Sequence, residues 1–338
     1  MRTKIIAGLG PTSAKPDIIQ AMIEAGVDIF RFNFAHGDYE EYKLWGTWIK
    51  EAGKKLERPV EIYQDLSGPR LRVGTQPNGG RQLVNGQRLI LVRAGEETSP
   101  DQITTTGIDI MGQVKSGERI LLANGEISLQ AEQVSASQIE ASVISGGLLK
   151  SNKSINLPDS LLTVSSLTEK DKQDFAFGLS QDYAYVGISF VQDAEDIHEL
   201  RPLMPNSRRI IAKIERQTAI NNIDAIIEAA DIIMIARGDM GAELPIEEVP
   251  FVQKMIIKKC NLAKKPSITA TQMLTSMIEK PYPTRAEVSD IANAVLDGTS
   301  AVWLSDETTI GQHPVECVKI MRKICEKAES YLDETLKT

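Results

Sequence analysis

The sequence predicts an α/β protein built on a (β/α)₈ TIM barrel, with a small all-β cap domain inserted after strand three. Short β-branched runs alternate with longer amphipathic runs along most of the 338 residues, which is the pattern of parallel strands joined by helices. Residues 72–156 interrupt this alternation and contain no Trp, Tyr or Phe. Without them roughly 250 residues remain, the size of a bare barrel.

The barrel prediction depends on eight strand-helix units in succession. In chain order the expected strands are Thr3–Leu9, Val27–Phe34, Val60–Leu66, Ala184–Phe190, Arg209–Ile214, Asp231–Ala236, Ser267–Thr271 and Ala301–Ser305. Amphipathic periodicity predicts helices that include Lys15–Ala25, Thr168–Ser180, Ile220–Ala229 and Val249–Ala263. Eight such units favour a closed barrel over an open doubly wound sheet.

The interrupting segment has the turn chemistry of antiparallel strands. Its alternating runs include Arg88–Val92, Arg119–Leu122 and Ile139–Ile144, and turns are expected at Asn85-Gly86, Ser116-Gly117 and Asn124-Gly125. We therefore divide the chain into residues 1–71 as the first part of the barrel, 72–156 as the β-rich cap, and 157–338 as the second part of the barrel.

Charge and composition exclude several classes of function. The 38 basic and 46 acidic side chains give a formal net charge of −8, which argues against a partner with a phosphate backbone, so no nucleic acid is expected. No apolar run approaches the roughly 20 residues of a membrane span, and no signal peptide is visible, so we expect a cytoplasmic protein without membrane contact. The three cysteines form no CxxC pair and are expected to be reduced thiols.

Polar side chains follow nearly every predicted strand. Because barrel enzymes work at the carboxyl ends of their strands, these residues are the candidates for chemistry. They are Arg31, Asn33 and His36 after strand two; Asp65, Arg70 and Arg72 after strand three; Lys213 and Glu215 after strand five; Arg237, Gly238 and Asp239 after strand six; Thr271 after strand seven; and Ser305 and Glu307 after strand eight.

Glu215 and Asp239 suit a hard divalent cation, magnesium or manganese, because carboxylates from adjacent strands reach the same mouth. An ion-pair network among these two residues, Lys213 and Arg237 fits the same spacing equally well. The cations Arg31, Arg72 and Lys213 would clamp a phosphoryl group. The chain has neither a Walker A motif nor a GxGxxG fingerprint, so a nucleotide would have to bind in another way.

At these residues the sequence resembles the pyruvate kinase family. The segments that carry the resemblance are Arg31–Gly37, Lys213–Glu215, Ile235–Gly241, Gln253–Asn261, Thr269–Leu274, Pro283–Asp290 and Val295–Thr299. The resemblance implies that the insert is the hinged cap of that family. It also leads us to expect a short member that lacks the family's C-terminal domain and the effector site within it.

Residue by residue, the resemblance implies a phosphoenolpyruvate site beside a nucleotide site. Glu215 and Asp239 would hold the metal, Lys213 would stabilise the phosphoryl group in flight, and Arg31 would bind phosphate. The amides of Gly238 and Asp239, with Thr271, would hold the substrate carboxylate. The remaining assignments are Asn33 and Arg72 to substrate binding, Ser305 to catalysis, and His36 and Lys170 to the nucleotide side.

The chain departs from the family pattern on the acceptor side. Gly8 and Ala35 stand where the family has threonine and serine, Asp306 replaces a glycine, and Ile310 replaces a lysine that faces the nucleotide. Arg70 replaces a glutamate beside the family's monovalent-cation site. A fixed guanidinium there would supply the positive charge itself, so we expect potassium not to be required.

We therefore expect a homodimeric, metal-dependent enzyme that binds phosphoenolpyruvate or pyruvate. The leading hypothesis is phosphoryl transfer between phosphoenolpyruvate and ADP through the enolate of pyruvate. The first alternative is a related enzyme with another acceptor or enolate reaction, such as enolpyruvate transfer or decarboxylation of a 2-oxo acid. The second is a catalytically silent metabolite-binding protein, which the presence of Lys213, Glu215 and Asp239 disfavours.

Overall fold

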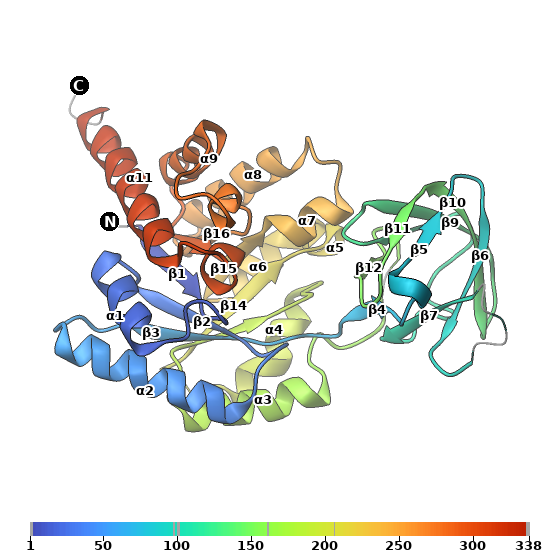
Figure 1. Cartoon of the computed structure of the whole chain (residues 1–338), viewed down its shortest axis with the longest axis horizontal. Helices are drawn as coiled ribbons and strands as arrows, with labels where there is room; N and C mark the ends of the chain where they lie inside the picture. Colours follow the sequence, from blue (N-terminus) through green and yellow to red (C-terminus); the bar gives the residue numbers. More distant parts are fainter. Residues whose placement is uncertain (1–2, 97–98, 100–101, 161, 206, 336–338) are drawn as a thin grey trace.

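A computed structural model describes residues 3–96, 99, 102–160, 162–205 and 207–335 (Figure 1). Its main sheet is a closed parallel barrel with the strand order β1-β17-β16-β15-β14-β13-β3-β2, so the predicted barrel is confirmed. The strands are β1 (Lys4–Gly8), β2 (Ile29–Asn33), β3 (Glu61–Asp65), β13 (Tyr185–Ile188), β14 (Arg209–Ile214), β15 (Ile232–Ala236), β16 (Ser267–Ala270) and β17 (Ala301–Leu304).

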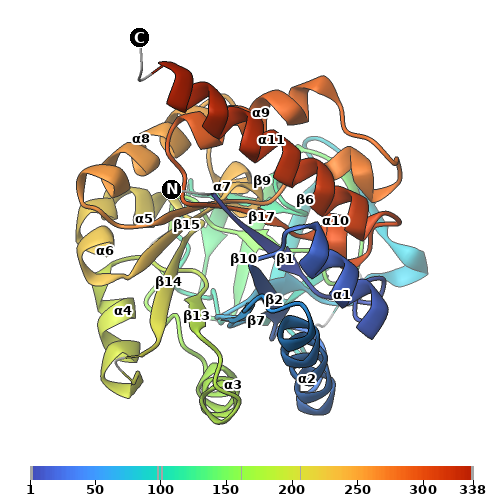
Figure 2. The same cartoon turned by 90° about the vertical axis from the view of Figure 1, so that its left-hand side faces the viewer.

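Helices surround the barrel as a ring (Figure 2). They are α1 (Pro16–Ala25), α2 (Tyr39–Lys55), α3 (Glu169–Ser180), α4 (Ala194–Leu200), α5 (Gln217–Asn221), α6 (Ile223–Ala229), α7 (Arg237–Glu243), α8 (Val249–Leu262), α9 (Arg285–Leu296), α10 (Asp306–Thr309) and α11 (Pro314–Thr335), with the short 3₁₀ turns η2 (Arg201–Leu203) and η3 (Thr275–Ile278). A further 3₁₀ turn, η1 (Pro77–Gly79), belongs to the chain between β3 and β13 and not to this ring. Reciprocal capping boxes start α2, α3, α4 and α9.

One helix prediction is wrong. The run Ile220–Ala229 is divided between two helices, α5 and α6, which meet at Asn222. The Asn222 side chain donates a hydrogen bond to the Gln192 carbonyl at 3.0 Å, which ties the junction to the loop after β13. An amphipathic period cannot reveal such a break, because the apolar positions of both helices still face the barrel.

The chain between β3 and β13 forms two further sheets, which lie to one side of the barrel (Figure 1). The larger has the order β12-β8-β9-β10-β6-β7-β4, and the smaller pairs β11 with β5. The strands are β4 (Leu71–Val73), β5 (Arg81–Leu83), β6 (Arg88–Arg93), β7 (Gln102–Gly107), β8 (Arg119–Leu122), β9 (Ile127–Val134), β10 (Gln138–Ser145), β11 (Gly147–Leu149) and β12 (Ile155–Asn156). The exact boundaries 71/72 and 156/157 stay predictions.

The two parts of the molecule have separate cores. The barrel interior packs branched aliphatic side chains with Tyr63, Tyr185 and Trp303, whereas the smaller unit is filled by aliphatic residues such as Leu91, Ile120 and Leu129. A core of its own is what an inserted unit needs to fold around.

Two further expectations concern the cysteines and membrane-spanning helices. Cys260, Cys317 and Cys325 are buried and unpaired, as expected. Among the described residues, no helix is both long and apolar enough to cross a membrane.

Candidate active site

The carboxyl ends of the barrel strands border two neighbouring cavities. One, of about 550 Å³, lies beneath the β8–β9 turn and includes Gly238, Asp239 and Thr271 in its wall. The other, of about 610 Å³, is bordered by the ends of β1 and β2 and by α2. Ser305 and Asp306 line both cavities, so the two are adjacent at the end of β17.

A chain of buried charges crosses the floor of this region. Arg31 donates from Nε and Nη2 to Asp65 Oδ2, at 2.9 and 2.6 Å. Lys213 Nζ lies 3.3 Å from Asp65 Oδ1 and 2.9 Å from Glu215 Oε1, and it donates to Ser189 Oγ at 2.8 Å. All four charged side chains are buried. The two cations and two carboxylates thus alternate, which satisfies each charge in a site with little water.

These contacts fix the protonation of the buried groups. Burial alone would raise the pKa of Asp65, but Lys213 and Arg31 hold that pKa below its ordinary value. Burial also opposes a charged Lys213, yet Asp65 and Glu215 raise the pKa of its amine to about 12. Lys213 is therefore a fixed cation at neutral pH, not a proton donor or acceptor.

Glu215 and Asp239 form the pair of carboxylates predicted to hold a metal. Glu215 Oε2 accepts a hydrogen bond from the Phe190 amide at 2.8 Å, which orients the carboxylate. The Asp239 carboxylate opens into the cavity and has no hydrogen-bond partner in the described part of the chain. Partial loss of hydration inside the cavity, and then repulsion from Glu215, raise the pKa of Asp239 to about 6.

This arrangement fits a divalent cation that takes only two ligands from the protein. A hard cation between the two carboxylates would relieve the repulsion that raises the Asp239 pKa. Across the described ranges, no group of three or more His, Cys, Asp or Glu side chains is arranged as a closed metal cage. The rival ion-pair network is only partly formed, because Lys213 contacts Glu215 while Arg237 turns away to Asp290.

Thr271 and Gly238 lie together, as the sequence predicts. The Gly238 amide donates to Thr271 Oγ1 at 2.8 Å, and the same hydroxyl donates to the Ala270 carbonyl at 2.7 Å. A Cβ on Gly238 would lie 3.3 Å from Thr271 Oγ1. Glycine thus permits a close approach that a side chain would crowd.

The second cavity is lined by two of the four departures from the family pattern, Asp306 and Ile310. Its wall includes Asn33, His36, Asp306 and Ile310, together with the carboxylate of Glu41. Partial burial and the nearby cations Arg70, Arg72 and Arg31 lower the pKa of His36, so this ring is neutral near pH 7. Arg31 is the cation in the wall, and it is already paired with Asp65.

Gly8 has a packing reason that the sequence did not reveal. A Cβ at this position would lie 2.8 Å from Thr309 Cγ2, and Thr308 Oγ1 donates to the Gly8 carbonyl at 2.9 Å. The end of β1 is therefore closed against α10. A hydroxyl is missing here because the neighbouring element occupies its space.

Three predicted binding residues are not joined to this cluster by a direct contact. Arg72 donates to the Asn152 carbonyl within the smaller unit, and Lys170 contacts the Phe34 carbonyl and Asp174. Arg70 is partly buried, and burial together with Arg72 lowers the pKa of its guanidinium. Arg70 thus lies near charges of both signs, Arg72 and Arg31 as well as Asp65 and Glu215, and no ion pair to it is formed within the described residues.

The structure adds Ser189 and Trp303 to the site and gives a role to Asp65, which the sequence indicates only as a candidate at a strand end. Asp65 bridges Arg31 to Lys213, Ser189 accepts from Lys213, and the Trp303 ring lies 5.0 Å beneath the Arg31 guanidinium. Asp65 has a visible signal, since it ends a strand. Ser189 and Trp303 have none, because their contacts come from strands far apart in sequence.

The fold and the site together define a (β/α)₈-barrel protein that gathers cations and carboxylates at its strand ends. More particularly, the chain belongs to the pyruvate kinase family. The family model for "Pyruvate kinase, barrel domain" matches residues 1–318.

Curated relatives named pyruvate kinase are similar in sequence to nearly the whole of this chain. It is 44% identical to the pyruvate kinase of Geobacillus stearothermophilus, over 98% of this chain and 58% of that protein. It is 44% identical to pyruvate kinase 2 of a Synechocystis strain, over 97% and 57%, and 42% identical to the pyruvate kinase of Thermococcus litoralis, over 98% and 70%. The chain thus spans less than two thirds of the length of the first two relatives.

Proposed function

We propose that this chain transfers a phosphoryl group between phosphoenolpyruvate and an acceptor, with the enolate of pyruvate as the intermediate. The observation that carries the proposal is Lys213, a buried and permanently charged amine fixed between Asp65 and Glu215 beside Arg31. Such preorganised cations lower the energy of a phosphoryl group as its charge spreads during transfer. The relatives named pyruvate kinase support the same reaction.

In this proposal each half of the substrate meets different residues. Arg31, oriented by Asp65 and the Trp303 ring, binds the phosphate, and Lys213 stabilises the phosphoryl group in transit. The Gly238 and Asp239 amides and the Thr271 hydroxyl would hold the carboxylate, and the substrate would then replace the hydrogen bond that the Gly238 amide donates to Thr271 Oγ1 in this structure. Thr271 then lies close to the carbon that gains or loses a proton.

Glu215 and Asp239 would hold magnesium or manganese. When bound, the ion neutralises developing charge on the enolate and phosphate oxygens. Glu215 is oriented for this by the Phe190 amide, and Asp239 is left open toward the cavity. Ser305 would take part in catalysis, and Asn33 and Arg72 would contribute to substrate binding.

The acceptor side favours a second candidate, a related enzyme that does not use ADP as its main acceptor. Glu41 and Asp306 place two carboxylates in the wall of the second cavity, and His36 is neutral there. Polyphosphate would meet like charge in this cavity. His36 and Lys170 would still be the nucleotide-side contacts if ADP binds, because Lys170 contacts the loop just before His36.

One incubation separates these possibilities. The protein, magnesium and phosphoenolpyruvate are mixed with or without ADP, and pyruvate, ATP and inorganic phosphate are followed by ³¹P and ¹H NMR. Equal release of ATP and pyruvate only with ADP supports the kinase reaction. Consumption of phosphoenolpyruvate without ADP supports another enolate reaction. A lack of turnover in both mixtures contradicts the kinase reaction with ADP, and it is the result expected of an enzyme with another acceptor or of a metabolite-binding protein.

A further inference from the structure

The loop that presents Thr271 has an unusual backbone. Thr271 and Gln272 both adopt left-handed conformations, with φ of 66° and 53°. This region is uncommon for residues other than glycine, and for a β-branched residue such as threonine it is a genuine outlier. Such conformations persist only where the surrounding structure holds them in place.

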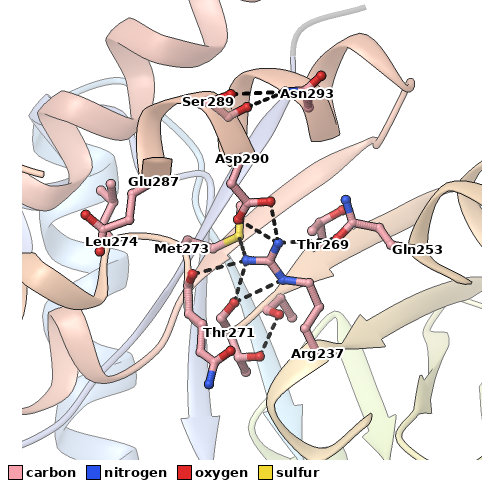
Figure 3. Close-up of polar contacts among 12 residues, drawn as sticks. Arg237, Gln253, Thr269, Thr271, Met273, Leu274, Glu287, Ser289, Asp290 and Asn293 are labelled. Atoms are coloured by element: carbon pink, nitrogen blue, oxygen red, sulfur yellow. Dashed lines mark hydrogen bonds and ion pairs between the residues drawn. The ribbon is translucent and has the colours of Figure 1, made fainter. Parts of the chain in front are cut away.

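The Arg237 guanidinium forms several hydrogen bonds to this loop (Figure 3). Its Nη2 donates to the Thr271 carbonyl at 2.8 Å, to the Gln272 carbonyl at 3.2 Å and to Met273 Sδ at 2.9 Å. Its Nε also reaches the Thr271 carbonyl, at 3.2 Å. One buried side chain thus binds both left-handed residues through their backbone.

The opposite edge of the same guanidinium is anchored to two helices. Arg237 Nη1 lies 2.7 and 2.6 Å from the two oxygens of Asp290 on α9, and 3.3 Å from Gln253 Oε1 on α8. Arg237 is part of the wall of the first cavity, but its guanidinium is bound by the Thr271 loop and by these two helices (Figure 3).

We propose that Arg237 is a positioning residue, which holds the Thr271 hydroxyl against the Gly238 amide by fixing the left-handed turn and transmits the position of α9 through Asp290. The geometry explains why arginine is needed. A planar fork can bind two carbonyls on one edge and a carboxylate on the other, whereas a lysine amine offers a single point of charge. The kinetic consequence of this proposal rests on the function proposed above, but the structural consequence does not.

A ligand-free experiment tests the structural part. Asp290→Ala removes the anchor without touching the loop, and Asp297→Ala is the matched control, because Asp297 near the end of α9 pairs with Lys254 on α8 but not with Arg237. Exchange of the Gly238 amide with deuterium is measured by NMR. We expect exchange at least tenfold faster in Asp290→Ala and unchanged in Asp297→Ala. Equal exchange in both variants and the wild type would overturn the proposal.

The kinetic part uses a second-site change. Arg237→Lys is expected to lower kcat about 100-fold, the effect of a small misplacement of a reacting group. Gln272→Gly allows a left-handed backbone without restraint, so the double variant should recover about tenfold of that loss. If Arg237→Lys instead acts through a general loss of stability, the single and the double variant should both have a lower melting temperature, and the double variant should not recover kcat. That result would refute positioning.

The two proposals can fail separately. If the wild type neither binds nor consumes phosphoenolpyruvate, the proposed function is wrong, and Gly238 exchange still decides the role of Arg237. If the wild type is active and neither exchange nor kcat responds to these variants, the positioning role alone is wrong.

Discussion

The two halves of the barrel mouth differ in whether their charged side chains are buried and paired. On the side of β3 and β14, the charges of Asp65, Lys213 and Glu215 are buried and paired with one another, and Arg31 on β2 pairs with Asp65 at the boundary between the two halves. On the side of β1 and β17, Asp306 and Ile310 are exposed, and the wall mixes carboxylates with apolar groups. A substitution in the first half leaves a buried charge without its partner, whereas a substitution in the second half alters a solvent-exposed surface.

In the proposed reaction, this difference separates the groups that phosphoryl transfer requires from the groups that select the acceptor. Breaking a buried pair by removing one partner costs about 3–5 kcal/mol, while an exposed charge contributes about 0–1 kcal/mol. The acceptor side can therefore change at little cost in stability. The departures at Asp306 and Ile310 fall on that side.

The largest effect is expected from Lys213→Met. Loss of the central cation should reduce kcat for phosphoenolpyruvate about 10³-fold, because a charge aimed at the transferring group is lost. The free energy of unfolding should fall by about 3–5 kcal/mol, since Asp65 and Glu215 lose their shared partner. Rates and urea unfolding are measured beside Asp306→Asn, the control from the other half. Similar losses in both variants would contradict the contrast between the halves.

Metal binding should show the same asymmetry. Glu215→Gln is expected to weaken Mn²⁺ binding about 10- to 100-fold in the presence of phosphoenolpyruvate, because an amide oxygen is a poorer ligand than a carboxylate. Titration calorimetry and water-proton relaxation measure the affinity, and circular dichroism verifies the fold. Asp306→Asn should bind Mn²⁺ as the wild type does. Wild-type affinity in Glu215→Gln would show that the ion is held elsewhere.

The sequence was sufficient for the parts of this comparison that depend on topology. In a parallel barrel every strand ends at the same face, so Arg31, Lys213, Glu215 and Asp239 had to meet there. Strand ends were less predictable: the run expected to reach Thr271 stops at Ala270, because Thr271 turns into the left-handed region.

The sequence alone could not predict which of those side chains form ion pairs with one another. Several charges of each sign converge on one face, and spacing does not say which cation meets which carboxylate. Arg237 pairs with Asp290, 53 positions later, and not with the nearby Asp239. Asp65 joins Arg31, which lies 34 positions before it, to Lys213. Only the packed strands and helices select these partners.

The acceptor side should gain affinity for ADP when its charge is restored. Asp306→Gly with Ile310→Lys removes an anion from the cavity wall and adds a cation, so ADP binding should improve about tenfold after screening by salt. Calorimetry with magnesium and oxalate, an analogue of the pyruvate enolate, measures the change. Ile310→Gln is the uncharged control. Tight ADP binding and rapid pyruvate formation by the unmodified protein would instead identify ADP as the ordinary acceptor.

Potassium should have a small effect. Arg70 carries a permanent charge close to the site, and Ala35 offers no hydroxyl to a monovalent ion, so activity should change less than about twofold when potassium replaces tetramethylammonium. Arg70→Glu restores a carboxylate and should introduce a potassium dependence. A severalfold activation of the wild type by potassium would show that Arg70 does not substitute for the ion.

The smallest effect concerns His36, at the border between the two halves. Partial burial and the cations Arg70, Arg72 and Arg31 lower its pKa below the ordinary value of 6.5. The folded protein then binds fewer protons here than the unfolded chain, so the contribution of His36 to stability is complete above pH 6.5 and is lost as the pH falls toward the lowered pKa. Arg70→Gln removes one of the repelling charges, so it should raise the pKa of His36 and lessen this loss. An NMR titration of the ring follows the change, with His198, which contacts Glu195 on α4, as the internal control. If Arg70→Gln leaves the His36 titration where it was, the guanidinium is too far from the acceptor cavity to act there, and the charge difference between the two halves must then come from Asp306 and Glu41.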